Sequence, residues 1–509
     1  MHKDLRFTRS KVYKYREVIQ EMQERYRIQQ DKTYSEHYVY YDTFDWRLYN
    51  KALILCSTGH TLLLQSLETH TVLERIAMTA PPVFLSDIPS GSLQEKVAPI
   101  IEMRALLTLF AMDVQSTHMR IMNNDAKTVV RLLCETGSMA AAQNPVPVAT
   151  CLWLKPVRGY AKEARRFSQW LSDHGWTLSG DPLYLQGLAA AGKHPGAYSS
   201  KMRLQLQPTL RADEATKIIL RSLLHVIKCN EAGVKNDIDT EFLHDFRVAI
   251  RRTRSALGQI KGVFPADVTA RFQRDFACLG SMTNRVRDLD VYLLHKEHYR
   301  ALLPAQLRLD IEPLFAHLQR ERAHAWRTLV RRLRSKTYAD ILARWEAFLV
   351  QPPAPDASAA NASRPILAVA RKRLRRRCRS VVQLGTDLLA EPDGQSLHAL
   401  RIACKKLRYV LEFFVSLFPG KNTAILVEHL RTLQDHLGRW HDIVVQQEDL
   451  HHFAMTFAGP DQQAHNTLRA IYSLIHILEA EKQTVGQMLP AMFTAFAAEV
   501  AHHKVLSSA

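Results

Sequence analysis

An internal repeat is the feature that most restricts what this chain can fold into. The segment FLHDFRVAIRRTRSALGQIKGVFP at residues 242–265 returns at residues 396–419 as SLHALRIACKKLRYVLEFFVSLFP, at a constant offset of 154 residues. The repeated basic residues are His244 and His398, Arg247 and Arg401, Arg251 and Lys405, Arg252 and Lys406, and Arg254 and Arg408. Surface residues without a role would diverge between two copies, so their retention indicates a shared function.

Both copies are predicted to be amphipathic helices. At about 100° per residue, His244, Arg247, Arg251 and Arg254 of the first copy fall on one face. Val248, Leu257 and Ile260 provide another face for burial, and a Phe-Pro pair ends each copy because proline cannot continue the helical hydrogen bonds. A basic stripe on a single helix usually faces solvent and nothing else. Two matching stripes favour a binding surface instead.

A second motif follows at the same offset. Residues 279–291 read LGSMTNRVRDLDV and residues 433–445 read LQDHLGRWHDIVV. The matching pairs are Arg285 and Arg439, Asp288 and Asp442, and, upstream of the first motif, Arg221 and Arg375. Two motifs that each occur twice in the same order predict two related helical halves.

The pattern H-x-x-R-x-x-x-[RK]-[RK]-x-R, followed by R-x-x-D-[LI]-x-V, resembles the CHAD family, the conserved-histidine α-helical domain. The resemblance covers roughly residues 209–500 and implies an all-α domain of two pseudo-symmetric helical bundles around a basic groove or pore. It also implies binding of inorganic polyphosphate. We expect this domain at 209–509, with repeats at 209–350 and 366–509 joined by a Pro/Ala-rich linker at 351–365.

Polyphosphate suits these residue types because it carries about one negative charge per phosphate and no base, so it is recognised by charge and repeated oxygen contacts. Arginine can bridge two oxygens, and lysine supplies a compact charge. The predicted contact residues are the repeated basic residues together with Arg221, Arg375, Arg285 and Arg439. The two motif histidines have an alternative role in helix packing. Asp288 and Asp442 are expected to hold the motif arginines in place.

Residues 1–208 have a different pattern, which predicts an α+β domain containing an antiparallel β tunnel or barrel. Apolar and β-branched residues dominate from residue 38 to residue 67, and Ser57–His60 (STGH) has the composition of a hairpin turn. Further strands are expected at 106–114, 118–123, 128–134 and 148–155, and helices at 93–100 and 162–173. A loop is expected at 137–147.

Residues 40–48, YYDTFDWRL, resemble the YYDTPDLRL segment of the CYTH or triphosphate tunnel family, which commonly precedes CHAD in one chain. That family opens with E-x-E-x-K, whose carboxylates hold a divalent metal, whereas this chain opens with MHKDLRF. Where the family carries basic residues, residues 52–56 read ALILC and residues 61–65 read TLLLQ. A later strand of the family has an acidic pattern of the form E-x-E-L-K. The corresponding residues 151–155 read CLWLK, so only Lys155 is retained.

Phosphoryl hydrolysis needs oxygen ligands for a hard cation and positive charge on the transferred phosphate. The departures from the family pattern therefore predict a catalytically inactive tunnel domain that packs or mediates self-association. Arg47, Arg104, Glu135 and Lys155 are expected to be structural or surface residues. A metal-dependent triphosphatase or polyphosphatase in this domain is the alternative.

The formal net charge of +18 favours a polyanionic partner but does not identify it. A general nucleic-acid-binding helical protein is therefore a further alternative. Few aromatic residues alternate with the cations of the motif helices, however, and such residues are needed for stacking on single strands. Polyphosphate remains the preferred ligand, and nucleic acid is not expected to be the specific one.

No catalytic residue, metal or cofactor is predicted. The seven cysteines form no CxxC pair, and glycine-rich phosphate loops are absent from the sequence. His436, His441, His451 and His452 lack partners at metal-ligand spacing. Without an apolar run of about 18 residues or a signal peptide, we expect no membrane span, and a cytoplasmic protein associated with polyphosphate granules.

Overall fold

The structure, a computed structural model, divides into two compact units, Met1–Ser199 and Ser200–Ala509. It describes residues 5–9, 15–139, 146–178, 181–202, 204–352, 359–390, 394–457, 459 and 461–502. The boundary falls before the expected residue 208 because the intervening segment packs on the helical unit. There Leu206 is buried, and its backbone N–H donates a hydrogen bond to Ser416 Oγ at 3.1 Å.

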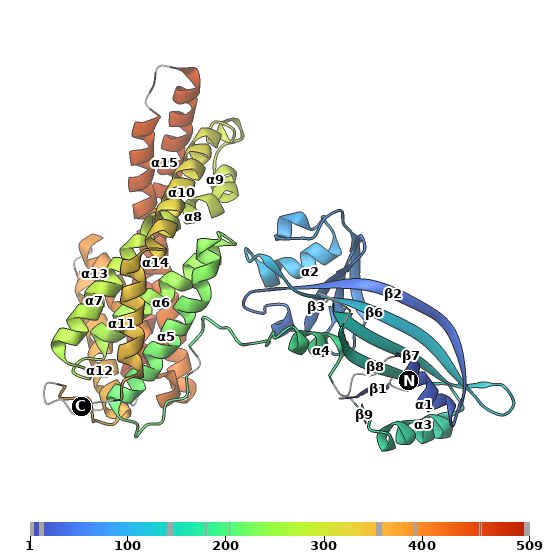
Figure 1. Cartoon of the computed structure of the whole chain (residues 1–509). Coiled ribbons are helices and arrows are strands. Elements are labelled where there is room, and N and C mark those ends of the chain that lie inside the picture. Colours follow the sequence, from blue (N-terminus) through green and yellow to red (C-terminus); the bar gives the residue numbers. More distant parts are fainter. Residues whose placement is uncertain are drawn as a thin grey trace. The chain divides into compact units, whose positions relative to one another are not determined.

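The N-terminal unit is built on one nine-stranded antiparallel sheet with the strand order β5-β4-β3-β2-β6-β7-β8-β1-β9 (Figure 1). The strands are β1 Leu5–Thr8, β2 Arg27–Thr43, β3 Leu53–Thr58, β4 Thr61–Ser66, β5 Val72–Ala77, β6 Leu106–Met122, β7 Thr128–Met139, β8 Val146–Pro156 and β9 Thr177–Leu178. The antiparallel α+β class is therefore confirmed. Among the described strands no ladder joins β5 to β9, so the hydrogen bonding of the sheet does not close.

Two sequence expectations for this sheet need correction. The strands expected at 106–114 and 118–123 are one strand, β6, because the polar residues between them continue the pairing with β2. Thr117 is fully buried there, and its hydroxyl lies 3.1 Å from that of Thr33. The loop expected at 137–147 is shorter, since β7 continues to Met139 and β8 begins at Val146; residues 140–145 lie outside the described residues.

Helices cover both faces of the sheet. On one face, Leu152 and Leu154 of β8 pack in a core with α1 (Tyr15–Gln23) and α3 (Ala161–Asp173). Because side chains alternate along a strand, Cys151 of β8 points to the opposite face, which packs on α4 (Leu183–Ala190). A Cβ atom at Gly187 would lie 2.4 Å from the Phe110 ring, so α4 rests directly on the sheet. Helix α2 (Ser92–Ile101) packs on β3 and β4 residues in a separate core.

The C-terminal unit is all-helical (Figure 1). Its helices repeat at the offset read from the sequence. Helices α5 (Ala212–Lys235) and α6 (Thr240–Gln259) correspond to α12 (Ile366–Ala390) and α13 (Gly394–Phe414). The remaining helices are α7 Ala266–Met282, α8 Asn284–Leu294, α9 Lys296–Leu302, α10 Glu312–Leu333, α11 Lys336–Val350, α14 Lys421–Thr456 and α15 Gln462–His502.

The two repeats differ where the second motif lies. In the first repeat the helix ends at Met282 and restarts at Asn284, whereas α14 runs unbroken through the matching positions. The Pro/Ala-rich linker also has more structure than its composition predicts. Ala359 and Ala362 are buried, and the backbone N–H of Asp213 donates to the carbonyl of Ala362 at 3.1 Å. The end of the linker is therefore fixed against the start of α5.

Candidate functional site

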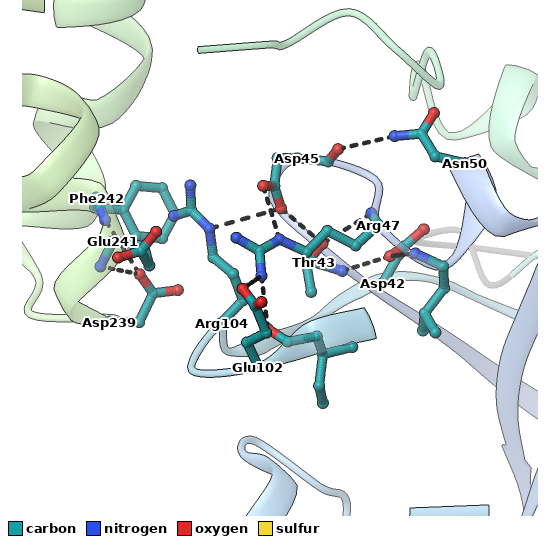
Figure 2. A network of polar contacts seen from close by, with 12 residues as sticks. Asp42, Thr43, Asp45, Arg47, Asn50, Glu102, Arg104, Asp239, Glu241 and Phe242 are labelled. Atoms are coloured by element: carbon teal, nitrogen blue, oxygen red, sulfur yellow. Dashed lines mark hydrogen bonds and ion pairs between the residues drawn. The ribbon is translucent and has the colours of Figure 1, made fainter. Parts of the chain in front are cut away.

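Helix α6, which carries the first motif, is fixed at its N-terminus by local contacts. The Asp239 carboxylate accepts hydrogen bonds from the backbone N–H groups of Glu241 (2.9 Å) and Phe242 (3.1 Å), an N-cap that supplies acceptors to the first turn (Figure 2). The Phe242 ring packs against Gly233 of α5, where a Cβ atom would lie 2.1 Å from it. These contacts set the rotation of α6 and therefore the direction of its basic face.

Helices α6 and α13 pack against each other, and a carboxylate joins them. Arg252 Nε donates to Glu412 Oε2 at 3.0 Å, and Arg408 Nε lies 3.3 Å from Glu412 Oε1. Arg252 Nη1 also donates to the carbonyl of Ser200 at 2.9 Å. Sequence reasoning missed Glu412, because the matching residue in the first repeat is Gly258. Its position four residues after Arg408 was the available signal.

Next to this joint, basic residues from both repeats form a group that we call the central cluster: Arg247 and Arg251 of α6, and Arg401 and Lys405 of α13. The Arg251 guanidinium lies 5.8 Å from the centre of the Tyr409 ring of α13. Burial, followed by the charges of Arg401 and Arg251, lowers the pKa of Lys405 to about 8. Burial also lowers the pKa of Arg401, and the charge of Arg251 adds to this shift. The charges of the cluster are thus close enough to repel one another.

Two aspartates of the second motif lie beside the central cluster. Asp442 Oδ1 of α14 is 3.6 Å from Arg401 Nη2. Desolvation raises the pKa of Asp288 of α8, and the charge of Arg247 opposes this shift, although no direct ion pair joins the two among the described residues. The cluster therefore has carboxylates at its edge, but fewer than it has cations.

The matching arginines Arg247 and Arg401 are held differently. Arg247 Nη1 donates to Thr283 Oγ1 at 2.7 Å and to Asn284 Oδ1 at 2.8 Å, where the first-repeat helix is broken. The residues of α14 that match Thr283 and Asn284 are Leu437 and Gly438, whose side chains cannot accept hydrogen bonds. Arg401 Nε is accordingly buried without a hydrogen-bond partner within the described part of the chain. The second repeat thus leaves more of its donor capacity unused.

A histidine pair extends the cluster along the second repeat. The rings of His398 on α13 and His441 on α14 have their centres 5.2 Å apart. Burial and the charges of Arg401, His398 and Lys405 lower the pKa of His441 to about 4. Sequence reasoning set His441 aside with the other helical histidines. Its location one position before Asp442 of the second motif was the signal. His244 is partly buried on α6.

The other predicted contact residues lie apart from the central cluster or have other contacts. Arg285 lies 3.5 Å from Glu321, Arg439 Nε donates to Glu481 at 2.7 Å, and Arg221 Nη1 donates to the carbonyl of Leu349 at 3.5 Å. Arg254 and Lys406 are exposed on α6 and α13, and Arg375 is partly buried on α12. The structure therefore gathers part of the predicted set and places the rest in separate contacts.

In the N-terminal unit, the YYDTFDWRL segment forms a tightly bonded turn (Figure 2). The buried Asp42 carboxylate accepts hydrogen bonds from the backbone N–H groups of Thr43 (2.7 Å), Leu48 (2.9 Å) and Tyr49 (2.9 Å). Burial raises the pKa of Asp42 to about 6, although these bonds oppose the shift. The Asp42 carboxylate is therefore used by backbone N–H groups of its own turn, and the segment has a clear structural role.

Two of the remaining cations of the tunnel-family pattern belong to the same turn. Arg47 Nε donates to Asp45 Oδ2 at 2.9 Å, and Arg47 Nη1 donates to Glu102 Oε2 at 2.7 Å. Arg104, almost fully buried, has its Nε 3.6 Å from Asp45 Oδ1 (Figure 2). Glu135 and Lys155, by contrast, line a cavity on the α4 face of the sheet.

Two common classes of site are absent from the described residues. No group of three or more histidine, cysteine, aspartate or glutamate side chains is arranged to hold a metal ion among them. No described helix combines the length and the apolar character that a membrane span requires.

The helical unit is thus an internally repeated α-domain whose two sister helices bring cations into one cluster. Residues 218–451 match the family model of the CHAD domain, and this part of the chain is a CHAD domain. No curated protein matches the chain.

Several solved structures are similar to the chain. One is the CHAD domain from the plant Ricinus communis, with 26% identity, 61% of this chain and 98% of that chain covered, and a TM-score of 0.49. PptA from Streptomyces chartreusis has 18% identity over 57% of this chain and 98% of its own, with a TM-score of 0.39. A Hippeastrum protein described as an adenylyl cyclase with a dominant triphosphatase activity has 12% identity over 39% of this chain and 100% of its own, with a TM-score of 0.25.

Proposed function

We propose that the CHAD domain binds inorganic polyphosphate through the central cluster, in a basic groove between the two repeats. The observation that carries the proposal is the grouping of Arg251, Arg401 and Lys405 from two sister helices. Burial and mutual repulsion lower the pKa of Arg401 and of Lys405. Such a group costs folding free energy, and a bound polyanion would offset that cost.

The contacts divide the predicted residues into two sets. Arg252 and Arg408 are engaged by Glu412, and Arg247 is engaged by Thr283 and Asn284, so these arginines position the helices. Arg251, Arg401 and Lys405 retain donor capacity and would contact phosphate oxygens directly. The exposed Arg254 and Lys406 would extend the contacts along the polymer.

The absence of a base in polyphosphate distinguishes it from nucleic acid. The Tyr409 ring is buried under the Arg251 guanidinium, so it is not presented for base stacking, which single-strand binders use. We therefore expect long-chain polyphosphate to displace DNA at equal phosphate concentration. Association with polyphosphate granules in the cytoplasm would follow from the same affinity.

We further propose that the N-terminal unit does not hydrolyse phosphoanhydrides. The α4 face of the sheet carries Ile54, Cys56 and Leu63 in its core, and these residues offer neither oxygen ligands nor positive charge. A phosphate-release assay with tripolyphosphate or polyphosphate, in the presence of Mg²⁺ or Mn²⁺, tests this proposal. Metal-dependent turnover would show instead that this unit is an active triphosphatase or polyphosphatase.

The binding proposal is tested by neutralising the cluster without removing its helices. The double variant Arg251→Gln, Lys405→Gln should weaken binding to long-chain polyphosphate by at least about tenfold, since each lost charged contact contributes about 1 kcal/mol or more. The matched control is Arg371→Gln, Lys372→Gln, which removes the same charge from exposed positions on α12. Equal affinities for the two folded double variants would mean that net charge, and not the cluster, determines binding.

A further inference from the structure

The α4 face of the N-terminal sheet contains a cavity of about 250 Å³ that has no role in the proposed function. Its walls include Tyr38 and Tyr40 of β2, Glu135 of β7, Trp153 of β8 and Tyr184 of α4. Drug-sized ligands usually occupy about 300 Å³ or more, so a ligand of this cavity has to be small.

Aromatic rings form a continuous part of this wall. The ring centres of Tyr38 and Tyr40 are 6.1 Å apart, and those of Tyr40 and Tyr184 are 5.4 Å apart. Tyr40 and Tyr184 are both buried. Their hydroxyl groups make no hydrogen bond to another of the described residues, and neither oxygen is among the buried polar atoms that lack a partner, so both remain accessible. The wall therefore offers both ring faces and unused polar atoms.

Glu135 places a carboxylate among these rings. Its Oε2 accepts a hydrogen bond from Trp153 Nε1 at 2.7 Å, while burial raises its pKa. No ion pair joins Glu135 to any described residue. A carboxylate in such surroundings is stabilised when a cation comes to it. Outside the lining residues, the exposed Glu36 carboxylate accepts a hydrogen bond from the Tyr38 hydroxyl at 2.5 Å.

The positive groups near the cavity leave this carboxylate open to a ligand. Burial has the largest effect on the pKa of Glu135, followed by the hydrogen bond from Trp153. The charge of Lys155 has a smaller effect, which lowers this pKa, and the Lys155 side chain is exposed. Arg6 lies 5.6 Å from the centre of the Trp153 ring, so one face of Trp153 already has a cation. The basic residues among the lining are Lys155 and His70. Burial, followed by the charge of Arg6, lowers the pKa of His70 to about 4, so its ring is neutral near pH 7.

We propose that this cavity binds a small organic cation, a protonated amine on an apolar or aromatic body. The ammonium group would pair with Glu135 and lie against the Tyr40 and Tyr184 rings, whose negative faces attract cations. The apolar body would fill the space beside Ile54 and Leu183, which also line the cavity. A phosphate at the same place would meet a carboxylate and ring faces, both of which repel anions.

The test uses the full chain and two probes of nearly equal size. 2-Phenylethylamine is charged near neutral pH, and 2-phenylethanol is its neutral counterpart. Titration calorimetry, with intrinsic tryptophan fluorescence as a second readout, should show saturable binding of the amine with a dissociation constant of about 1 mM or lower. The alcohol should bind at least about tenfold more weakly. This comparison needs no variant, so it stays decisive even if a variant fails to fold.

Glu135→Gln should weaken amine binding at least about tenfold, while Glu95→Gln, at an exposed position on α2, should leave it unchanged. Three results would overturn the proposal: no saturable binding of the amine, equal binding of amine and alcohol, or full amine binding by folded Glu135→Gln. Tripolyphosphate with Mg²⁺ is the competitor. If it binds and displaces the amine, the cavity is an anion site and the inference is wrong.

Discussion

Arg247 Nη1 donates a hydrogen bond to Thr283 Oγ1 at 2.7 Å, across the break between α7 and α8. The sister residue Arg401 has no such acceptor, and its Nε is buried without a hydrogen-bond partner in the described chain. Two arginines at matching positions therefore have different roles. Arg247 joins α6 to the broken helix, whereas Arg401 has donor capacity left for a ligand.

The first prediction compares these two arginines. Arg247→Ala should lower the free energy of unfolding by about 1–3 kcal/mol, because Thr283 and Asn284 lose a charged donor. Arg401→Ala should change stability little, since it removes a buried guanidinium that is incompletely bonded. Polyphosphate affinity should respond in the opposite order, with a loss of about tenfold for Arg401→Ala and less for Arg247→Ala. Chemical denaturation and equilibrium binding measure the two quantities. Equal losses of affinity in both variants would contradict this division.

The second prediction concerns pH and Lys405. Its pKa of about 8 reflects burial and the charges of Arg401, Arg251 and Arg408, against the opposing charge of Asp442. A bound polyanion raises this pKa, so protonated Lys405 contributes fully to binding below pH 8, and the contribution is lost as the pH rises through the higher pKa of the complex. Affinity should therefore fall about three- to tenfold between about pH 8 and pH 10.

Lys405→Arg should remove most of that pH dependence, because arginine stays charged over this range. The matched control is Lys406→Arg at the exposed neighbouring position, which should keep the wild-type profile. Parallel pH profiles for wild type and Lys405→Arg would show that another group titrates.

The third prediction tests the joint between the repeats. Glu412→Gln removes the charge that holds Arg252 and Arg408, whose side chains are partly buried. We expect the free energy of unfolding to fall by about 1–3 kcal/mol, since the charged hydrogen bonds become weaker and the arginines remain. Polyphosphate affinity should not fall, because the domain becomes more positive.

Glu428→Gln is the control for this change, because the Glu428–Arg431 pair on α14 is exposed. Exposed pairs contribute about 0–1 kcal/mol, so denaturation should hardly shift. A similar shift for both variants would mean that Glu412 does no more than a surface carboxylate.

The fourth prediction concerns the turn that contains Asp42. Asp42→Ala leaves three buried or partly buried backbone N–H groups without their acceptor, which should destabilise the N-terminal unit by about 3 kcal/mol or more. Differential scanning calorimetry should show a lower transition temperature. Asp125→Ala, at an exposed turn position, serves as the control, and an unchanged transition in Asp42→Ala would exclude a structural role for the segment.

The same carboxyl group gives this turn a pH dependence. The pKa of folded Asp42, about 6, lies above its ordinary value of 3.8. The part of its contribution to stability that depends on proton binding is therefore complete below about pH 4 and is lost as the pH rises through 6. The N-terminal transition should accordingly lose this contribution between about pH 4 and pH 6, and Asp42→Ala should not.

The helical architecture could be predicted because the same amphipathic pattern occurs in two segments of the sequence. A pattern shared by two segments located α6 and α13, and it also placed the RxxD motif on helices. The break at Thr283 could not be predicted, since α14 carries an equivalent pattern through Leu437 without interruption. Whether a helix breaks there depends on tertiary contacts, and one of these is the hydrogen bond from Arg247.

The division of the basic residues into structural and available groups was also beyond the sequence. Arg251 and Arg252 are adjacent and both match lysines, yet one contacts the Tyr409 ring and the other pairs with Glu412. Because Glu412 has no counterpart in the first repeat, the repeat itself concealed it. In the N-terminal unit, the enrichment in apolar and β-branched residues predicted strands, but α1 and α4 were missed because they are short.

The interrupted helix of the first repeat has a consequence for how a polymer would sit on the domain. A linear polyphosphate reads the same from either end, but the two halves beneath it would not be equivalent. In the half containing Arg401, Leu437 and Gly438 replace the hydrogen-bonding side chains of Thr283 and Asn284, and the nearest acceptor is the Asp442 carboxylate at 3.6 Å. Short oligophosphates should consequently settle on the second half first and reach the other only as the chain lengthens. The affinity of the domain would then depend on polymer length, with binding starting at α13.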